Sequence, residues 1–218
     1  MKFSPQTLAV LKNFSGINQN VFLRKGNVIS TINTGKSIFA TATIAEEIPS
    51  DVPVYDLGSL LALLSLTDSP EIEFGEKSLI ISKDGAEFEF FYSDPEILVF
   101  PPKKEINFPG FFTFTLSKDD VTTILKAAAV MSAPTMSIVS KSGKVMVKVG
   151  DPKVAASNSY KKVVGESDAE FNVQIAVEML KIIPENYEVS LTKQKFINFK
   201  NTERGLVYWL AAAPQSVV

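Results

Sequence analysis

The stretch VPVYDLGSLLALLSL, residues 52–66, decides the fold because it joins a strand pattern to a short, leucine-rich helix. Val52, Val54 and Tyr55 favour a strand, and Asp56 is a good helix N-cap. Six leucines follow within ten residues. A membrane-spanning helix needs about 20 apolar residues, so this one is too short to span a bilayer. We predict a buried helix over residues 57–66 that packs on a sheet.

The chain has 218 residues and contains neither cysteine nor histidine, which restricts its chemistry. Disulfides, thiolate nucleophiles, Ser–His relays and the common zinc sites are thereby excluded. The chain is 45% hydrophobic and 21% charged, which is typical of a globular protein with a sizeable core. We expect a protein that is not an enzyme and uses no cofactor or metal. A hydrolase that relies on carboxylates is a distant alternative.

The N-terminal segment gives no sign of export or membrane insertion. Residues 1–20 contain no apolar signal region, and no run of eighteen apolar residues occurs anywhere. We therefore expect a cytoplasmic protein, located in the host cell if the protein is viral.

One motif resembles a nucleotide-binding site but does not qualify as one. Residues 33–37 read NTGKS, like the end of a phosphate-binding loop, but the glycine required five positions earlier is Ser30. The flanking residues alternate as strands do, and no helix follows. We predict a hairpin turn made by Asn33, Thr34 and Gly35.

Each half of the chain predicts a helix, then strands, a short helix and further strands. In the first half, residues 4–18 (SPQTLAVLKNFSGIN) predict a helix that Ser4 caps, and the leucine-rich helix is the second. In the second half, a helix begins after Ser117, with Asp120 completing a capping box. Residues 176–183 (AVEMLKII) predict the fourth helix, which Pro184 ends.

The repeated order predicts an α+β fold of two similar domains, each with two helices packed on antiparallel sheets. The segment between the halves contains Pro101, Pro102 and Pro109, and paired prolines disfavour both helix and central strand. We place the first domain at residues 1–100, an extended connector at 101–110 and the second domain at 111–218.

Several segments resemble the sliding clamp of T-even-type bacteriophages. They are VLKNFSGIN (10–18), the leucine-rich stretch 52–66, the pair Phe108-Pro109 and PENYEVSL (184–191), in that order along nearly the whole chain. The C-terminus is shorter than in that relative.

The resemblance implies a DNA-clamp fold and a homotrimeric ring that encircles duplex DNA without sequence preference. It further implies that an ATP-dependent clamp loader places the ring on DNA. The replicative polymerase would bind it through a C-terminal peptide and gain processivity. The alternative is a β-rich, ring-forming virion or scaffold protein that does not encircle DNA.

The charge distribution is compatible with a ring that encloses DNA rather than gripping it. Residues 1–109 carry a net charge of −5 and residues 110–218 a net charge of +3, whereas proteins that grip phosphates are usually basic overall. Lysines on the solvated side of a helix are common in any globular protein. Together with the resemblance, they predict a mildly positive, DNA-facing surface formed by Lys2, Lys12, Lys118, Lys126 and Lys181.

The resemblance also implies an apolar pocket for partner peptides beside the connector. Small residues at the end of the last strand, AAAP (211–214), leave room for an inserted apolar anchor. Alternatively, Phe100 only closes the core of the first domain and AAAP is a frayed end. The pocket candidates are Val99, Phe100, Pro101, Leu210, Ala212 and Pro214.

Overall fold

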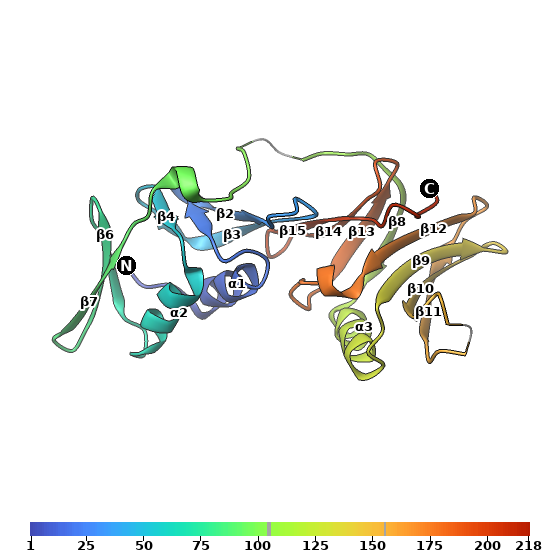
Figure 1. Cartoon of the computed structure of the whole chain (residues 1–218), viewed down its shortest axis with the longest axis horizontal. Helices are drawn as coiled ribbons and strands as arrows, with labels where there is room; N and C mark the ends of the chain where they lie inside the picture. Colours follow the sequence, from blue (N-terminus) through green and yellow to red (C-terminus); the bar gives the residue numbers. More distant parts are fainter. Residues whose placement is uncertain (104–105, 155) are drawn as a thin grey trace. The chain divides into compact units, whose positions relative to one another are not determined.

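The computed structural model describes residues 1–103, 106–154 and 156–218, which form two compact units. The first unit contains Met1–Lys104 and Arg204–Leu206, and the second contains Glu105–Glu203 and Val207–Val218. Each unit combines helix with antiparallel sheet, as the α+β prediction required (Figure 1). Among the described residues, no helix combines the length and apolar character needed to cross a membrane.

The first unit consists of two helices lying side by side, three antiparallel strand groups and a 3₁₀ turn (Figure 1). Strand β1 pairs with β4, β2 pairs with β3, and β5, β6 and β7 form a three-stranded sheet. The elements are α1 (Pro5–Ser15), β1 (Val21–Leu23), β2 (Gly26–Ile32), β3 (Ile38–Ile48), β4 (Val52–Val54), α2 (Leu57–Ser65), β5 (Glu71–Phe74), β6 (Ser78–Lys83), β7 (Ala86–Phe91) and η1 (Pro95–Ile97).

The leucine-rich stretch forms the predicted helix, α2. The carboxylate of Asp56 accepts a hydrogen bond of 3.0 Å from the Ser59 N–H and so caps the helix. Leu57, Leu60 and Leu64 are buried. Their spacing of three and four residues places them on one side of the helix, which packs beside α1.

The predicted hairpin turn at residues 33–37 is confirmed. The Asn33 side-chain oxygen accepts hydrogen bonds from the backbone N–H groups of Ser37 (2.8 Å) and Ile38 (2.9 Å). Strands β2 and β3 flank the turn and pair antiparallel. The turn therefore joins two strands, and no helix N-terminus follows to hold a phosphate.

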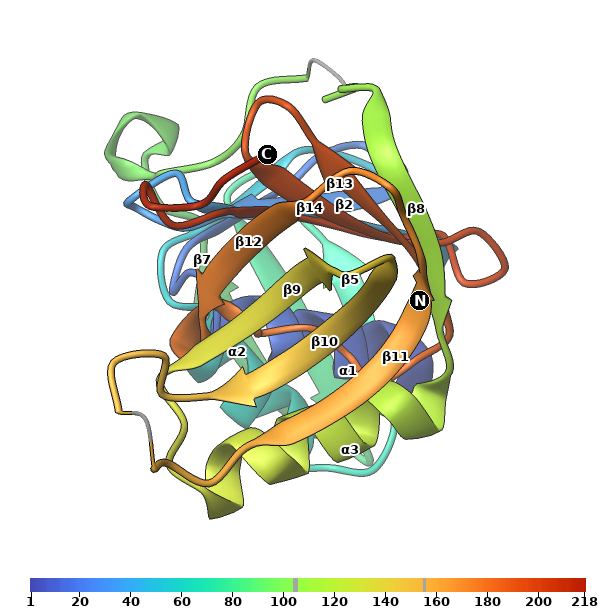
Figure 2. The same cartoon turned by 90° about the vertical axis from the view of Figure 1, so that its right-hand side faces the viewer.

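The second unit has one α-helix and two sheets (Figure 2). One sheet has the strand order β11-β10-β9-β12, and the other brings together β8, β13, β14 and β15. Tyr187, Phe199 and Tyr208 pack edge to face in its core, with ring centroids 5.9 and 6.2 Å apart. The elements are β8 (Gly110–Leu116), α3 (Lys118–Val130), β9 (Thr135–Lys141), β10 (Lys144–Gly150), β11 (Tyr160–Glu166), β12 (Phe171–Ala176), η2 (Val177–Met179), β13 (Tyr187–Thr192), β14 (Phe196–Asn201) and β15 (Leu206–Ala211).

The predicted fourth helix over residues 176–183 is wrong. Only the 3₁₀ turn Val177–Met179 forms there, and no side chain caps it. Pro184 disfavours helical backbone at Ile183, so too few residues remain to propagate a helix. Leu180 and Ile182 are buried from an irregular segment instead. The second unit therefore has one α-helix in its described part, where two were predicted.

Strand β8 was not predicted, because the connector was placed at residues 101–110 and no element was assigned between it and the helix that begins after Ser117. Their pattern of aromatic and threonine residues alternates as a strand does. In the structure, β8 pairs antiparallel with β13.

Candidate nucleic-acid and partner surfaces

Helix α1 places Lys12 on its solvated side. The hydroxyl of Ser4 accepts a hydrogen bond of 3.2 Å from the Thr7 N–H, and Pro5 occupies the first helical position. Val10, Leu11 and Phe14 are buried, whereas Lys12 is exposed. The ammonium group of Lys12 therefore points away from the core of the first unit.

The start of α1 is tied to strand β3 by a carboxylate. Glu46 accepts hydrogen bonds from the Ser4 backbone N–H and from the hydroxyl of the buried residue Thr7. Burial raises the pKa of Glu46, but these hydrogen bonds outweigh burial and leave the pKa below its ordinary value. The contact fixes the position of the helix that carries Lys12.

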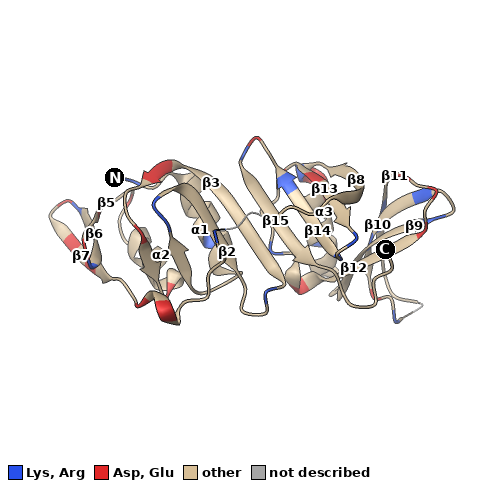
Figure 3. Ribbon diagram, turned by 90° about the horizontal axis from the view of Figure 1, so that it is seen from above, with Lys and Arg blue, Asp and Glu red and all other residues tan. Residues whose placement is uncertain are grey.

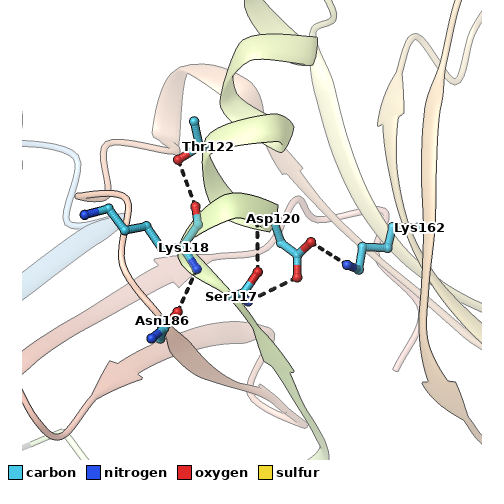
Figure 4. A network of polar contacts seen from close by, with 6 residues as sticks. All are labelled: Ser117, Lys118, Asp120, Thr122, Lys162 and Asn186. Carbon is cyan, nitrogen blue, oxygen red and sulfur yellow. Dashed lines mark hydrogen bonds and ion pairs between the residues drawn. The ribbon is translucent and has the colours of Figure 1, made fainter.

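Helix α3 carries Lys118 and Lys126 on exposed positions (Figure 4 shows Lys118). The capping box is present: the Ser117 hydroxyl accepts from the Asp120 N–H, and Asp120 accepts from the Ser117 N–H. The Lys118 N–H donates to the Asn186 side-chain oxygen at 2.8 Å. These bonds satisfy the first N–H groups of the helix and fix its direction.

Lys162 on β11 forms an ion pair with Asp120 (Figure 4). Partial burial raises the pKa of Asp120, whereas hydrogen bonds from Lys162 and Ser117 lower it. The hydrogen bonds together have the larger effect, so the pKa lies below its usual value. The same hydrogen bond raises the pKa of Lys162. The carboxylate is therefore ionised at neutral pH and accepts hydrogen bonds from both Lys162 and the Ser117 N–H.

The other two predicted DNA-facing lysines lie outside helices. Lys181 is exposed, and it lies on the irregular segment after η2 rather than on a helix. Lys2 is exposed and forms an ion pair of 3.4 Å with Glu71. Glu71 therefore offsets part of the positive charge of Lys2.

The exposed side of α2 is small and uncharged. Gly58, Ser59, Ala62 and Ser65 are exposed there, and the helix has no lysine or arginine. We assigned no DNA contact to this helix from the sequence. In the structure, its exposed side carries no positive charge that could attract DNA phosphates.

The six pocket candidates belong to different units. Val99, Phe100 and Pro101 lie in the first unit, and Leu210, Ala212 and Pro214 lie in the second. Leu210 is fully buried, so its side chain belongs to the core of the second unit.

The segment AAAP is not a frayed end. The Ala212 N–H donates to the Lys195 carbonyl at 2.7 Å, and the Lys195 ammonium donates to the Pro214 carbonyl at 2.8 Å. Beyond it, Val217 pairs with Asn172 on β12 through two hydrogen bonds of 2.9 Å. The C-terminal segment is therefore anchored at both ends, with Ala212 half-buried and Pro214 exposed.

An aromatic cluster that sequence reasoning missed lies at the second-unit end of the connector. The ring of Phe108 stacks on Phe196 (centroids 5.5 Å apart) and meets Trp209 edge to face (5.7 Å). The pair Phe108-Pro109 was noted only as part of a family pattern. The available signal was the alternation of side chains along β14 and β15. It places Phe196 on the side of β14 opposite Phe199, and Trp209 on the side of β15 opposite Tyr208.

Within residues 1–103, 106–154 and 156–218, no cluster of three acidic side chains is arranged to hold a metal ion. The fold consists of two α+β units, each with helix and antiparallel sheet. Solved structures show that this is the DNA-clamp fold: proliferating cellular nuclear antigen from Entamoeba histolytica matches with a TM-score of 0.70 at 14% identity, covering 97% of both chains.

A second solved structure, A. fulgidus PCNA bound to the C-terminal region of FEN-1, matches with a TM-score of 0.72 at 13% identity, covering 99% of this chain and 98% of that one. Residues 2–90 match the family model described as DNA polymerase processivity factor. The chain is 32% identical to the sliding clamp of Enterobacteria phage T4 over 199 residues, or 88% of this chain and 87% of that protein. It is 31% identical to the sliding clamp of Vibrio phage KVP40 over 200 residues, covering 88% and 90% of the two chains.

The chain therefore belongs to the family of phage sliding clamps, as the sequence resemblance predicted. Its function is that of a polymerase processivity factor in DNA replication, and the family is not enzymatic. The alternative of a virion or scaffold protein is not supported, because these relatives are replication proteins.

Proposed function

We propose that three copies of the chain close into a ring that encircles duplex DNA and tethers the replicative polymerase in the cytoplasm of an infected cell. The observation that carries the proposal is the pair of sheet edges at β7 and β11. The opposite edges of these two sheets are occupied by the chain termini: Met1 pairs with Ile72 on β5, and Val217 pairs with Asn172 on β12. In these two sheets, β7 and β11 are therefore the terminal strands without a neighbouring strand among the described residues, and each could pair with a second copy.

The two edge strands have similar lengths, and each exposes an apolar side chain. β7 has six residues and exposes Phe91 (67%), and β11 has seven residues and exposes Val163 (55%). Pairing β7 of one copy with β11 of the next would cover both side chains. Because the two edges differ, the contact is head-to-tail, and such contacts generate closed rings when the rotation permits.

The two edges also differ in the charged residues they carry; Figure 3 shows where acidic and basic residues lie along the chain. β7 carries the exposed residues Glu87 and Glu89. On the other sheet, Lys161 of β11 stands directly opposite Lys148 of β10. Like charges opposite each other destabilise a strand pair. Acidic side chains from a second copy would relieve this repulsion.

The DNA-facing surface is proposed from the lysines of the helices. Lys12 and Lys126 are the strongest candidates, because both are exposed on helices whose apolar side faces the core. The other three lysines are weaker candidates. Lys181 lies on a loop, Lys118 is next to the acidic residue Asp119, and Lys2 is paired with Glu71. A weakly basic lining suits a ring that must slide, since many phosphate contacts would hold it in place.

We further propose that the C-terminal peptide of the polymerase binds beside Ala212 and Pro214, and that an ATP-dependent loader opens the ring. In the solved structure of A. fulgidus PCNA, that protein holds the C-terminal region of FEN-1. In this chain, Ala212 is half-buried and its backbone N–H is held by the Lys195 carbonyl, so a small side chain stands where an apolar anchor would bind.

Mass in solution and retention on DNA test the ring. We expect a particle with three times the mass of the 23.8 kDa chain, which stays on closed circular DNA after loading and leaves cut DNA. Glu87→Lys or Lys161→Glu alone should lower the mass, and the two changes together should restore it. A monomer at tens of micromolar that does not shift with DNA and loader would overturn the proposal.

A further inference from the structure

Residues 99–101, where the first domain meets the connector, are held by side chains instead of a neighbouring strand. The Asn18 side-chain NH₂ donates to the Val99 carbonyl at 2.8 Å, and the Asn20 side-chain oxygen accepts from the Val99 N–H at 3.3 Å. Asn18 is buried and also donates to the Ile32 carbonyl at 2.7 Å. These bonds fix the backbone at Val99 to the segment between α1 and β1.

Arg24 extends this attachment to the next two residues. Its guanidinium donates to the Pro101 carbonyl at 3.1 Å. Its Cζ lies 5.2 Å from the ring centroids of both Phe22 and Phe100, and those rings stack 4.7 Å apart. A guanidinium within about 6 Å of an aromatic ring is attracted by the ring quadrupole. One side chain therefore holds the Phe100 ring and the Pro101 backbone together.

Lysine cannot reproduce this arrangement. The planar guanidinium can lie against a ring and still direct an N–H to a carbonyl, whereas an ammonium is a strongly hydrated point charge. The neighbouring Lys25 is exposed, and only its backbone N–H makes a described contact, a hydrogen bond of 2.8 Å to Asp51. The two adjacent cations thus differ in role although they carry the same charge.

We infer that Arg24 is a positioning residue for partner binding: it orders residues 99–101 so that an apolar polymerase peptide meets a preformed connector. The inference rests on the proposed binding of the polymerase peptide, for which Val99, Phe100 and Pro101 were also candidates from the sequence. Phe100 is half-buried, so part of this residue is accessible to a partner. A connector ordered before binding gives higher affinity, because less conformational entropy is lost when the peptide binds.

Two measurements on the full chain test the role of Arg24. Hydrogen–deuterium exchange of the segment around residues 99–103 reports its order, and anisotropy of a labelled C-terminal peptide of the cognate polymerase reports affinity. Arg24→Ala should speed exchange in this segment and raise the peptide Kd about tenfold, the scale of one hydrogen bond plus one cation–π contact. Arg24→Lys should give a smaller rise, and the matched control Lys25→Ala should change neither quantity.

The outcomes separate this inference from the proposed function. Faster exchange with an unchanged Kd would overturn the positioning role alone. Unchanged exchange in Arg24→Ala would overturn the attachment itself. Failure of the wild-type chain to bind the peptide would overturn the proposed peptide site. If Lys25→Ala lost as much peptide affinity as Arg24→Ala, the loss would come from the positive charge alone. That result would overturn the specific role of Arg24.

Discussion

The ammonium group of Lys162 on β11 donates a hydrogen bond to the carboxylate of Asp120, the third residue of α3 (Figure 4). The same carboxylate accepts from the Ser117 N–H and completes the capping box. One side chain thus joins the start of a lysine-bearing helix to a strand that we propose as a subunit edge.

Asp120→Asn should destabilise the chain by about 1 kcal/mol at pH 7, since it weakens both a cap and a partly exposed ion pair. The folded pKa of Asp120 lies below the unfolded value of 3.8. Its contribution is therefore present above the unfolded pKa, begins to decline as the pH approaches that value, and is lost as the pH falls through the folded pKa. Urea unfolding should show a gap between wild type and variant that shrinks towards pH 2.5. The exposed neighbour change Asp119→Asn is the control, and a gap independent of pH would contradict the assignment.

Changing Lys12, Lys126 and Lys181 together to glutamate should leave folding intact, because all three side chains are exposed. It should weaken loading and processivity, most strongly at low salt, where screening is least. Primer extension on circular templates with the loader measures the effect. The matched control changes three other exposed lysines to glutamate: Lys36, Lys77 and Lys193. Normal loading of the first variant at low salt would show that these lysines do not face DNA.

Gly205→Ala should destabilise the first unit by about 2–4 kcal/mol, combining left-handed backbone strain with steric overlap. Gly205 has φ +59°, and an added Cβ would lie 2.7 Å from Thr43 Cβ. Gly143→Ala is the matched control, because Gly143 has φ +79° with open space around it. It should cost only about 1 kcal/mol. Equal shifts in the melting temperatures of the two variants would contradict the steric part of this account.

Ala212→Trp should fill the proposed peptide site and block the polymerase peptide with little change in melting temperature. Ala212 is half-buried, and its backbone N–H donates to the Lys195 carbonyl, a bond that any residue except proline can keep. Peptide anisotropy measures the affinity, with Ala169→Trp, an exposed change in the same unit, as the control. An unchanged affinity, or an unfolded variant, would place the site elsewhere.

The sequence by itself determined the three α-helices and the hairpin turn at residue 33, because their signals are local. Caps at Ser4, Asp56 and Ser117 lie within a few residues of the groups they satisfy. Apolar spacing then set which side of each helix is buried. The family followed from the order of such segments, and the relatives confirm it.

The tertiary structure alone decided the contacts between residues far apart in the chain. It replaced the predicted fourth helix with a 3₁₀ turn, because burying Leu180 and Ile182 outweighed a weak helical pattern next to Pro184. It also paired Lys162 with Asp120, 42 residues away, and attached Arg24 to Pro101, 77 residues away. A lysine or arginine in sequence gives no sign of its partner, because that partner depends on which strands and loops the fold brings within hydrogen-bonding distance.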